Sequence, residues 1–157
     1  MAALSNGTTV GETHDEWRRV AGRWPALWEL FHDCNLGLSA ARTARVLGVP
    51  GRDRLEAELR QRGLPPHQLF RDWVYLRLLV DRAVEGGEPL ARQAQRRGKD
   101  PAPYYRFISR VAGRPWAMVL RLGSDWVRAT ALTVWSPYLC DGDRGAGPGG
   151  AGPAGLA

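Results

Sequence analysis

The chain has 157 residues, which suffices for one domain of ordinary size and excludes a large multidomain enzyme. A hydrophobic fraction of 44%, with seven Trp, is enough to bury a core, so most of the chain is not expected to be disordered. No apolar run nears the roughly 20 residues of a bilayer span, Met1 to Val10 shows no secretory signal, and Cys34 and Cys140 are too few for a disulfide framework or a zinc site. We therefore expect a cytoplasmic protein without membrane contact, metal or other cofactor.

Positive charge is concentrated in the middle of the chain. The whole sequence carries 22 basic and 16 acidic residues, and Lys99 is the only Lys. Residues 39–121 hold 17 basic and 8 acidic residues, net +9, whereas the segments before and after them are net −2 and −1. A coding bias toward Arg would spread the charge evenly, and a surface that meets a polyanion would concentrate it. The middle segment is the expected interface, with a merely solvated basic face as the alternative.

The first helical signals follow a small, polar start. Residues 1–12 are expected to be disordered, because they lack bulky apolar side chains. Thr13 and Glu16 form an S/T-x-x-E capping pattern, which predicts that a helix begins there. Pro25 should end this helix and begin a second one. Residues 13–38 are therefore predicted to form N-terminal helices.

A repeat with a period of 50 residues follows. Seven identities occur in the 29 positions of residues 38–66. Ala41, Arg42, Ala44, Gly48, Arg60, Gly63 and Pro65 fall on Ala91, Arg92, Ala94, Gly98, Arg110, Gly113 and Pro115. Each copy reads as a helix, a Gly-containing turn and a second helix. Residues 66–85 lie between the copies and carry apolar side chains at helical spacing without a breaker, which predicts one long connecting helix.

The chain is predicted to end in one more helix and a tail. Ser124 and Asp125 can cap a segment that runs to Trp135, so residues 122–140 are expected to hold a C-terminal helix. Residues 141–157 consist mainly of Gly, Ala and Pro and are expected to be disordered. The predicted fold class is all-α, with about eight helices. The Trp residues recur at helical spacing and are interpreted as core rather than as ligand cages.

Two helix-turn-helix units joined by one long helix resemble the DNA-binding region of AraC/XylS-type transcription regulators. The matching residues are Ala41 to Gly48, Leu55, Leu59, Gly63, Leu64 and Pro65 in the first unit, Leu69, Trp73, Arg77, Leu78 and Leu79 in the connector, and Leu90, Ala91, Ala94, Gly98, Tyr104, Ile108, Gly113, Arg114 and Pro115 in the second. The resemblance covers residues 39–121, about half of the chain. It implies that the second helix of each unit enters the major groove, with the two insertions one DNA turn apart.

The resemblance also assigns DNA-contacting residues. Those expected to meet base edges are Arg52, Arg54, Tyr104 and Arg106, and those expected to meet phosphates are Arg60, Lys99 and Arg110, with help from Arg42 and Arg92. The sequence departs from the family at Pro50, where a Ser usually caps the recognition helix. Asp53, Glu56 and Glu58 place three carboxylates on the first recognition helix, which would repel phosphates unless they face away or accept from cytosine.

These observations predict a sequence-specific double-stranded DNA-binding protein, an AraC-type transcription regulator without a sensing domain. The alternative is a protein-interaction module with a regulator-like fold that has lost DNA binding and grips a partner through its Trp-rich ends. In a DNA-bound regulator, the same ends would suit RNA polymerase or another protein. We do not expect an enzyme, because His32 and Cys34 point different ways on a helix and Tyr104 and Tyr105 have no partner base.

Overall fold

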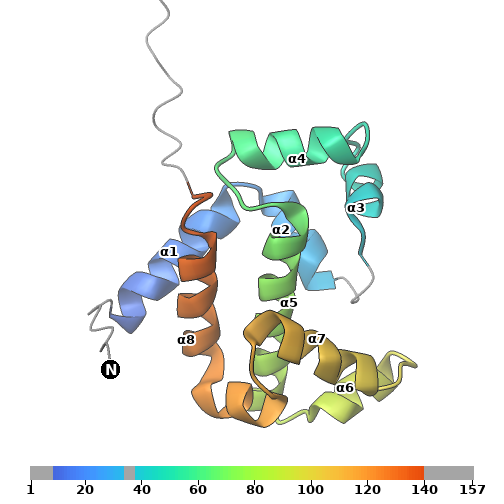
Figure 1. Cartoon of the computed structure of the whole chain (residues 1–157), viewed down its shortest axis with the longest axis vertical. Helices are drawn as coiled ribbons and strands as arrows, with labels where there is room; N and C mark the ends of the chain where they lie inside the picture. The colour runs from blue at the N-terminus through green and yellow to red at the C-terminus, as the bar shows by residue number, and fades with distance from the viewer. Residues whose placement is uncertain (1–8, 34–37, 140–157) are drawn as a thin grey trace, which may run out of the picture.

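The computed structural model describes residues 9–33 and 38–139, and within these ranges the chain forms eight α-helices and no strand (Figure 1). The helices are α1 (Val10–Gly22), α2 (Pro25–Asp33), α3 (Ala40–Val46), α4 (Arg52–Gln61), α5 (His67–Val84), α6 (Leu90–Arg96), α7 (Ala102–Ala112) and α8 (Trp116–Trp135). The all-α prediction is thereby confirmed. The predictions for residues 1–8 and 141–157, and those for both cysteines, lie outside the described residues. The disorder predicted for residues 1–12 is wrong from Val10 onward, where the chain is helical.

The start of α1 corrects one prediction. The helix begins at Val10 rather than near Thr13, because the capping pattern occurs twice and the earlier copy is the one used. The Thr9 hydroxyl accepts from the Glu12 backbone N–H at 3.4 Å, and the Glu12 carboxylate accepts from the Thr9 N–H at 2.8 Å. Thr13 lies in the first turn, where its hydroxyl donates to the Thr9 carbonyl. The predicted break before Pro25 is confirmed, since α2 begins at that residue.

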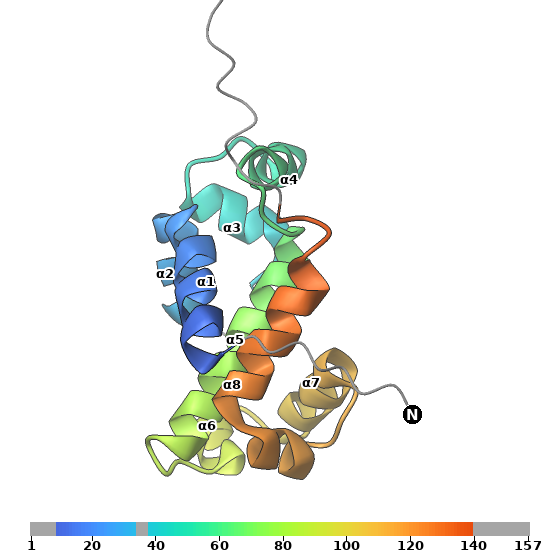
Figure 2. The same cartoon turned by 90° about the vertical axis from the view of Figure 1, so that its left-hand side faces the viewer.

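The core is built around α5. This helix packs against α8 along much of its length, α1 covers α8, and α2 packs on α5 (Figures 1 and 2). Aromatic side chains join these layers: Trp17 of α1 stacks on Trp135 of α8 with ring centroids 5.1 Å apart. Trp135 meets Phe70 of α5 edge to face, and Phe70 meets Phe31 of α2 in the same way. Each such pair adds roughly 0.5–1.5 kcal/mol to the burial of its rings, so the N-terminal helices belong to the core.

Two helix pairs lie at opposite ends of α5 (Figure 1). We call α3 and α4 the first pair, and α6 and α7 the second pair. Each first helix ends in the same Schellman motif: Val49 N–H donates to the Ala44 carbonyl at 2.8 Å, and Lys99 N–H donates to the Ala94 carbonyl at 3.0 Å. The glycine in each motif has positive φ, 69° at Gly48 and 65° at Gly98. The 50-residue repeat of the sequence thus appears as a repeat of backbone hydrogen bonds.

The last element, α8, consists of two helical segments that meet at Gly123, whose φ of 83° and ψ of 179° are not helical. The second segment follows Gly123 and corresponds to the helix predicted after Ser124 and Asp125. The first segment, which begins at Trp116, was not predicted. The Ser124 hydroxyl donates to the Asp81 carboxylate of α5, which fixes the kink against the central helix. None of the helices in the described ranges has the length and apolar character needed to cross a bilayer.

Candidate nucleic-acid interface

The second helices of the two pairs run in broadly similar directions. In Figure 1, α4 crosses the upper end of the molecule and α7 the lower end, and both run from right to left along the chain. Figure 2, turned by 90°, views α4 along its axis and α7 obliquely, so the two helix axes are inclined to each other. Between them, the 18 residues of α5 span about 27 Å at the usual rise of a helix. The molecule therefore carries two similarly oriented helices, one at each end of α5.

On α7, burial separates two faces cleanly. The face that packs on α5 and α8 consists of Tyr104, Phe107, Ile108 and Val111. The opposite face consists of Ala102, Tyr105, Arg106 and Ser109, all exposed. Tyr104 is only 2% exposed whereas Tyr105 is 43% exposed. This corrects the assignment of Tyr104 to a base contact: two adjacent tyrosines left the register of the helix open, and the burial of Phe107 and Ile108 decides it.

The expected cations of the second pair are available to solvent. Arg92, Lys99 and Arg106 are exposed, and none of them makes an ion pair within the described part of the chain. Asp100 precedes α7, and its carboxylate accepts from the Ala102 backbone N–H at 2.9 Å. This acid therefore caps the helix that carries Arg106. The α7 segment itself contains no carboxylate.

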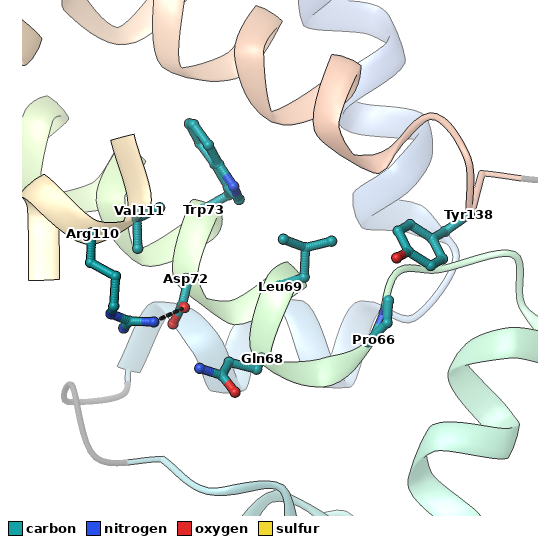
Figure 3. Close-up of a pocket in the computed structure, with 8 residues that line it drawn as sticks. All are labelled: Pro66, Gln68, Leu69, Asp72, Trp73, Arg110, Val111 and Tyr138. Atoms are coloured by element: carbon teal, nitrogen blue, oxygen red, sulfur yellow. Dashed lines mark hydrogen bonds and ion pairs between the residues drawn. The ribbon is translucent and has the colours of Figure 1, made fainter. Parts of the chain in front are cut away.

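Arg110 has a different environment (Figure 3). Its Nη1 lies 3.3 Å from Oδ2 of Asp72, and Oδ1 of the same carboxylate lies 2.8 Å from Nη2 of Arg71. Arg71 also donates to the Leu38 carbonyl at 2.8 Å. Asp72 thus ties α7 to α5 and to the segment before α3, beside an open cleft of about 380 Å³. Arg110 is placed to hold this junction, and a phosphate would have to compete with Asp72 for it.

On α4, the expected cations Arg52, Arg54 and Arg60 are exposed. The three carboxylates of this helix have separate surroundings. Glu58 lies 3.4 Å from Arg54 Nε and 3.6 Å from Arg62 Nη2.

Glu56 accepts from the His67 backbone N–H at 3.3 Å and so caps α5, where a negative charge also suits the helix dipole. Asp53 is exposed in the first turn of α4. Two of the three acids therefore serve contacts within the molecule, and Asp53 is left facing solvent.

A set of contacts braces the first pair against the N-terminal helices. The Arg23 guanidinium donates to the Gly63 carbonyl at 2.6 Å, and Arg62 donates in return to the Arg23 carbonyl at 3.3 Å. Arg62 also lies over the Trp24 ring, 4.2 Å from its centroid. These contacts were missed by sequence reasoning, because no local pattern links residues 40 positions apart. They hold the C-terminal end of α4 in place.

His67 fixes the other side of the first pair. It is 2% exposed, and its Nε2 lies 2.7 Å from the Thr43 hydroxyl, which itself donates to the Ser39 carbonyl at 2.9 Å. The Thr43 proton is thus engaged, which assigns the ring proton to Nε2 as donor. Burial and the neighbouring Arg71 lower the pKa of His67 to about 4, so the ring is neutral near pH 7. A neutral imidazole therefore joins α3 to α5.

The Trp-rich ends lie mostly inside the molecule. Trp17, Trp24, Trp73 and Trp135 are buried, and Trp28 packs edge to face on Trp17. The interpretation of these residues as core is thus confirmed. His32 bonds the Trp28 carbonyl at 2.8 Å through Nδ1, and within residues 9–33 and 38–139 no group of three or more His, Cys, Asp or Glu could hold a metal ion.

No protein-family model matches this chain, and it has no significant match among curated proteins or solved structures. The functional argument therefore depends on the arrangement of the chain's own residues.

Proposed function

We propose that the protein binds double-stranded DNA sequence-specifically through both helix pairs and regulates transcription in the manner of AraC-type regulators. The observation that carries the proposal is the broadly similar direction of α4 and α7 at the two ends of α5 (Figures 1 and 2). A double helix presents its major groove to one side once per turn, so two similarly oriented helices can enter successive openings of the groove. The groove is wide enough to admit an α-helix.

Charge supports the same reading. Residues 39–65, which include the first pair, hold six basic and three acidic residues, and residues 88–114, which include the second pair, hold seven and two. Arg106 lies at the centre of the exposed face of α7 and is the candidate for a base contact. Arg52 and Arg54 take the corresponding role on α4. Lys99, Arg60, Arg42 and Arg92 are exposed and suit phosphates, which give affinity without sequence information.

The protein-interaction alternative has less support. It needs an exposed aromatic surface at the ends of the chain, whereas Trp17 and Trp135 are stacked in the core. The carboxylates of α4 would favour this alternative if they repelled phosphates, but Glu56 and Glu58 are engaged within the molecule. DNA binding is therefore the better-supported function.

The test is a mobility assay of the full chain on duplex DNA at 50 mM and 200 mM salt. Neutralising six or more phosphates should cost about a thousandfold in affinity between these conditions, because bound counterions are released. Arg106→Ala should relax the preference at one base pair, and Arg92→Ala should weaken all sequences alike. Arg18→Ala on α1, also exposed, is the matched control for charge and should leave affinity unchanged. Absent or salt-independent binding, or a control as weak as the Arg92 variant, would contradict the proposal.

A further inference from the structure

The exposed face of α7 has a composition that its packing does not explain. Ala102, Tyr105, Arg106 and Ser109 follow the i, i+3, i+4, i+7 spacing of a helical stripe, opposite the buried stripe that begins at Tyr104. A solvated helix face is ordinarily rich in charged and polar side chains. Here an Ala methyl and a tyrosine ring flank the guanidinium of Arg106. The stripe therefore combines one cationic fork with adjacent apolar surface.

The side chains of this stripe have no structural task in the described residues. Neither the Tyr105 ring nor the Arg106 guanidinium takes part in a hydrogen bond, ion pair or ring contact there. Tyr105 is one of few large apolar side chains left exposed, at 43%. By contrast, the next arginine along the helix, Arg110, is held by Asp72 at 3.3 Å. Arg106 and Tyr105 are thus free to meet a ligand together.

We infer that this stripe reads a thymine next to a guanine in the major groove, with Tyr105 as a specificity-determining residue. The inference rests on the proposed DNA binding. An arginine fork matches the N7 and O6 acceptors of guanine, and apolar side chains contact the thymine 5-methyl group. On a helix, Ala102 is the i, i+3 neighbour of Tyr105 and the i, i+4 neighbour of Arg106, whereas Tyr105 and Arg106 diverge by about 100° on either side of it. Their side chains therefore reach different base pairs, and the methyl contact falls on a base pair adjacent to the guanine.

The same chemistry selects DNA over duplex RNA. Uracil lacks the 5-methyl group, and the major groove of A-form RNA is too narrow for side chains to read. A stripe that pairs an apolar contact with a guanine contact is therefore suited to B-form DNA that contains thymine. The ligand is a thymine-guanine step in a duplex, in either order.

The experiment uses chemically altered bases in a duplex selected by the full chain from random sequences. Each thymine is replaced by uracil, which removes the methyl group, and each guanine by 7-deazaguanine, which removes the N7 acceptor. One thymine should show a loss of roughly fourfold on loss of its methyl group. An adjacent guanine should show a loss of about tenfold.

The variants then assign each loss to a side chain. Tyr105→Ala should abolish the uracil effect and keep the 7-deazaguanine effect, and Arg106→Ala should do the reverse. Tyr105→Phe keeps the apolar ring and should behave as the native chain. Arg42→Ala, an exposed arginine of α3, should weaken binding to all duplexes and change neither effect.

The two possible failures are distinct. A chain that selects no duplex sequence overturns the proposed function together with this inference. A chain that selects a sequence but shows base effects unchanged in the Tyr105 and Arg106 variants overturns the readout alone. Equal binding to the uracil-substituted duplex at every thymine does the same.

Discussion

The two helix pairs share a backbone motif but are fixed to the molecule in different ways. In the first pair, α4 packs on α3 and α5 and is tied to the N-terminal helices by Arg23 and Arg62. In the second pair, α7 packs on α5 and α8 and is tied by one ion pair, Arg110 with Asp72. The first pair also carries an exposed carboxylate on its outer helix, and α7 carries none. The two pairs therefore have the same turn but differ in their packing contacts and in the charge of their exposed helix.

This comparison suggests a division of labour within the proposed DNA-binding site. The free Arg106 and Tyr105 suit α7 to base readout, whereas the bracing contacts suit the first pair to a fixed position on the duplex. Variants of single residues test whether the two pairs differ in this way.

The largest expected effect concerns the seam between α3 and α5 and depends on pH. Because burial lowers the pKa of His67 from 6.5 to about 4, the unfolded chain binds a proton below pH 6.5 that the folded chain takes up only near pH 4. The stability is therefore complete above pH 6.5 and should fall by roughly 3 kcal/mol as the pH drops through that window. Urea unfolding between pH 7 and pH 4 measures the change. His67→Gln should remove most of this pH dependence, and an unchanged slope in that variant would assign it to other groups.

The second effect concerns the brace on α4. Arg23→Ala removes the charged hydrogen bond to the Gly63 carbonyl and should lower the free energy of unfolding by about 2 kcal/mol. Arg19→Ala, an exposed arginine of α1, should change it by less than about 0.5 kcal/mol. Thermal or urea unfolding compares the two variants. Equal losses, or none in either, would show that the brace does not stabilise the first pair.

The third effect tests whether the glycine turns of the two pairs contribute equally to the stability of the protein. Gly48 and Gly98 have positive φ and open space at the Cβ position, so an Ala at either site meets strain without a steric clash. Gly48→Ala and Gly98→Ala should each cost about 1–2 kcal/mol, and the two costs should agree. Gly22→Ala in α1 also has open space but no positive φ, and should be neutral or slightly stabilising. Clearly unequal losses of unfolding free energy would show that the two turns, although alike in backbone, do not contribute equally to stability.

The sequence predicted what local chemistry decides. The Gly-containing turns, the break before Pro25 and the long helix between the copies follow from backbone preferences and helical periodicity, and the structure has all three. It could not decide choices between equal local signals, such as Thr9 against Thr13 as the cap of α1, or Tyr104 against Tyr105 as the exposed ring.

Contacts between distant segments were also beyond local reasoning. The pairing of Arg110 with Asp72 and the brace from Arg23 to Gly63 join residues about 40 positions apart, and no spacing rule marks them. Arg110 lies at the junction between α7 and α5 with 55% of its side chain exposed, so its predicted contact with phosphate stays a prediction.

The smallest expected effect bears directly on the difference between α4 and α7. Asp53 is the exposed carboxylate of α4, in its first turn, where it would face the phosphates of a bound duplex. Asp53→Asn removes this repulsion and should strengthen DNA binding about threefold at low salt, with a smaller gain at high salt because the charges are screened. Asp15→Asn on α1, exposed and of equal charge change, should leave the affinity as it is. A weaker rather than stronger complex would mean that Asp53 accepts a hydrogen bond from a cytosine amino group, and α4 would then read sequence as α7 does.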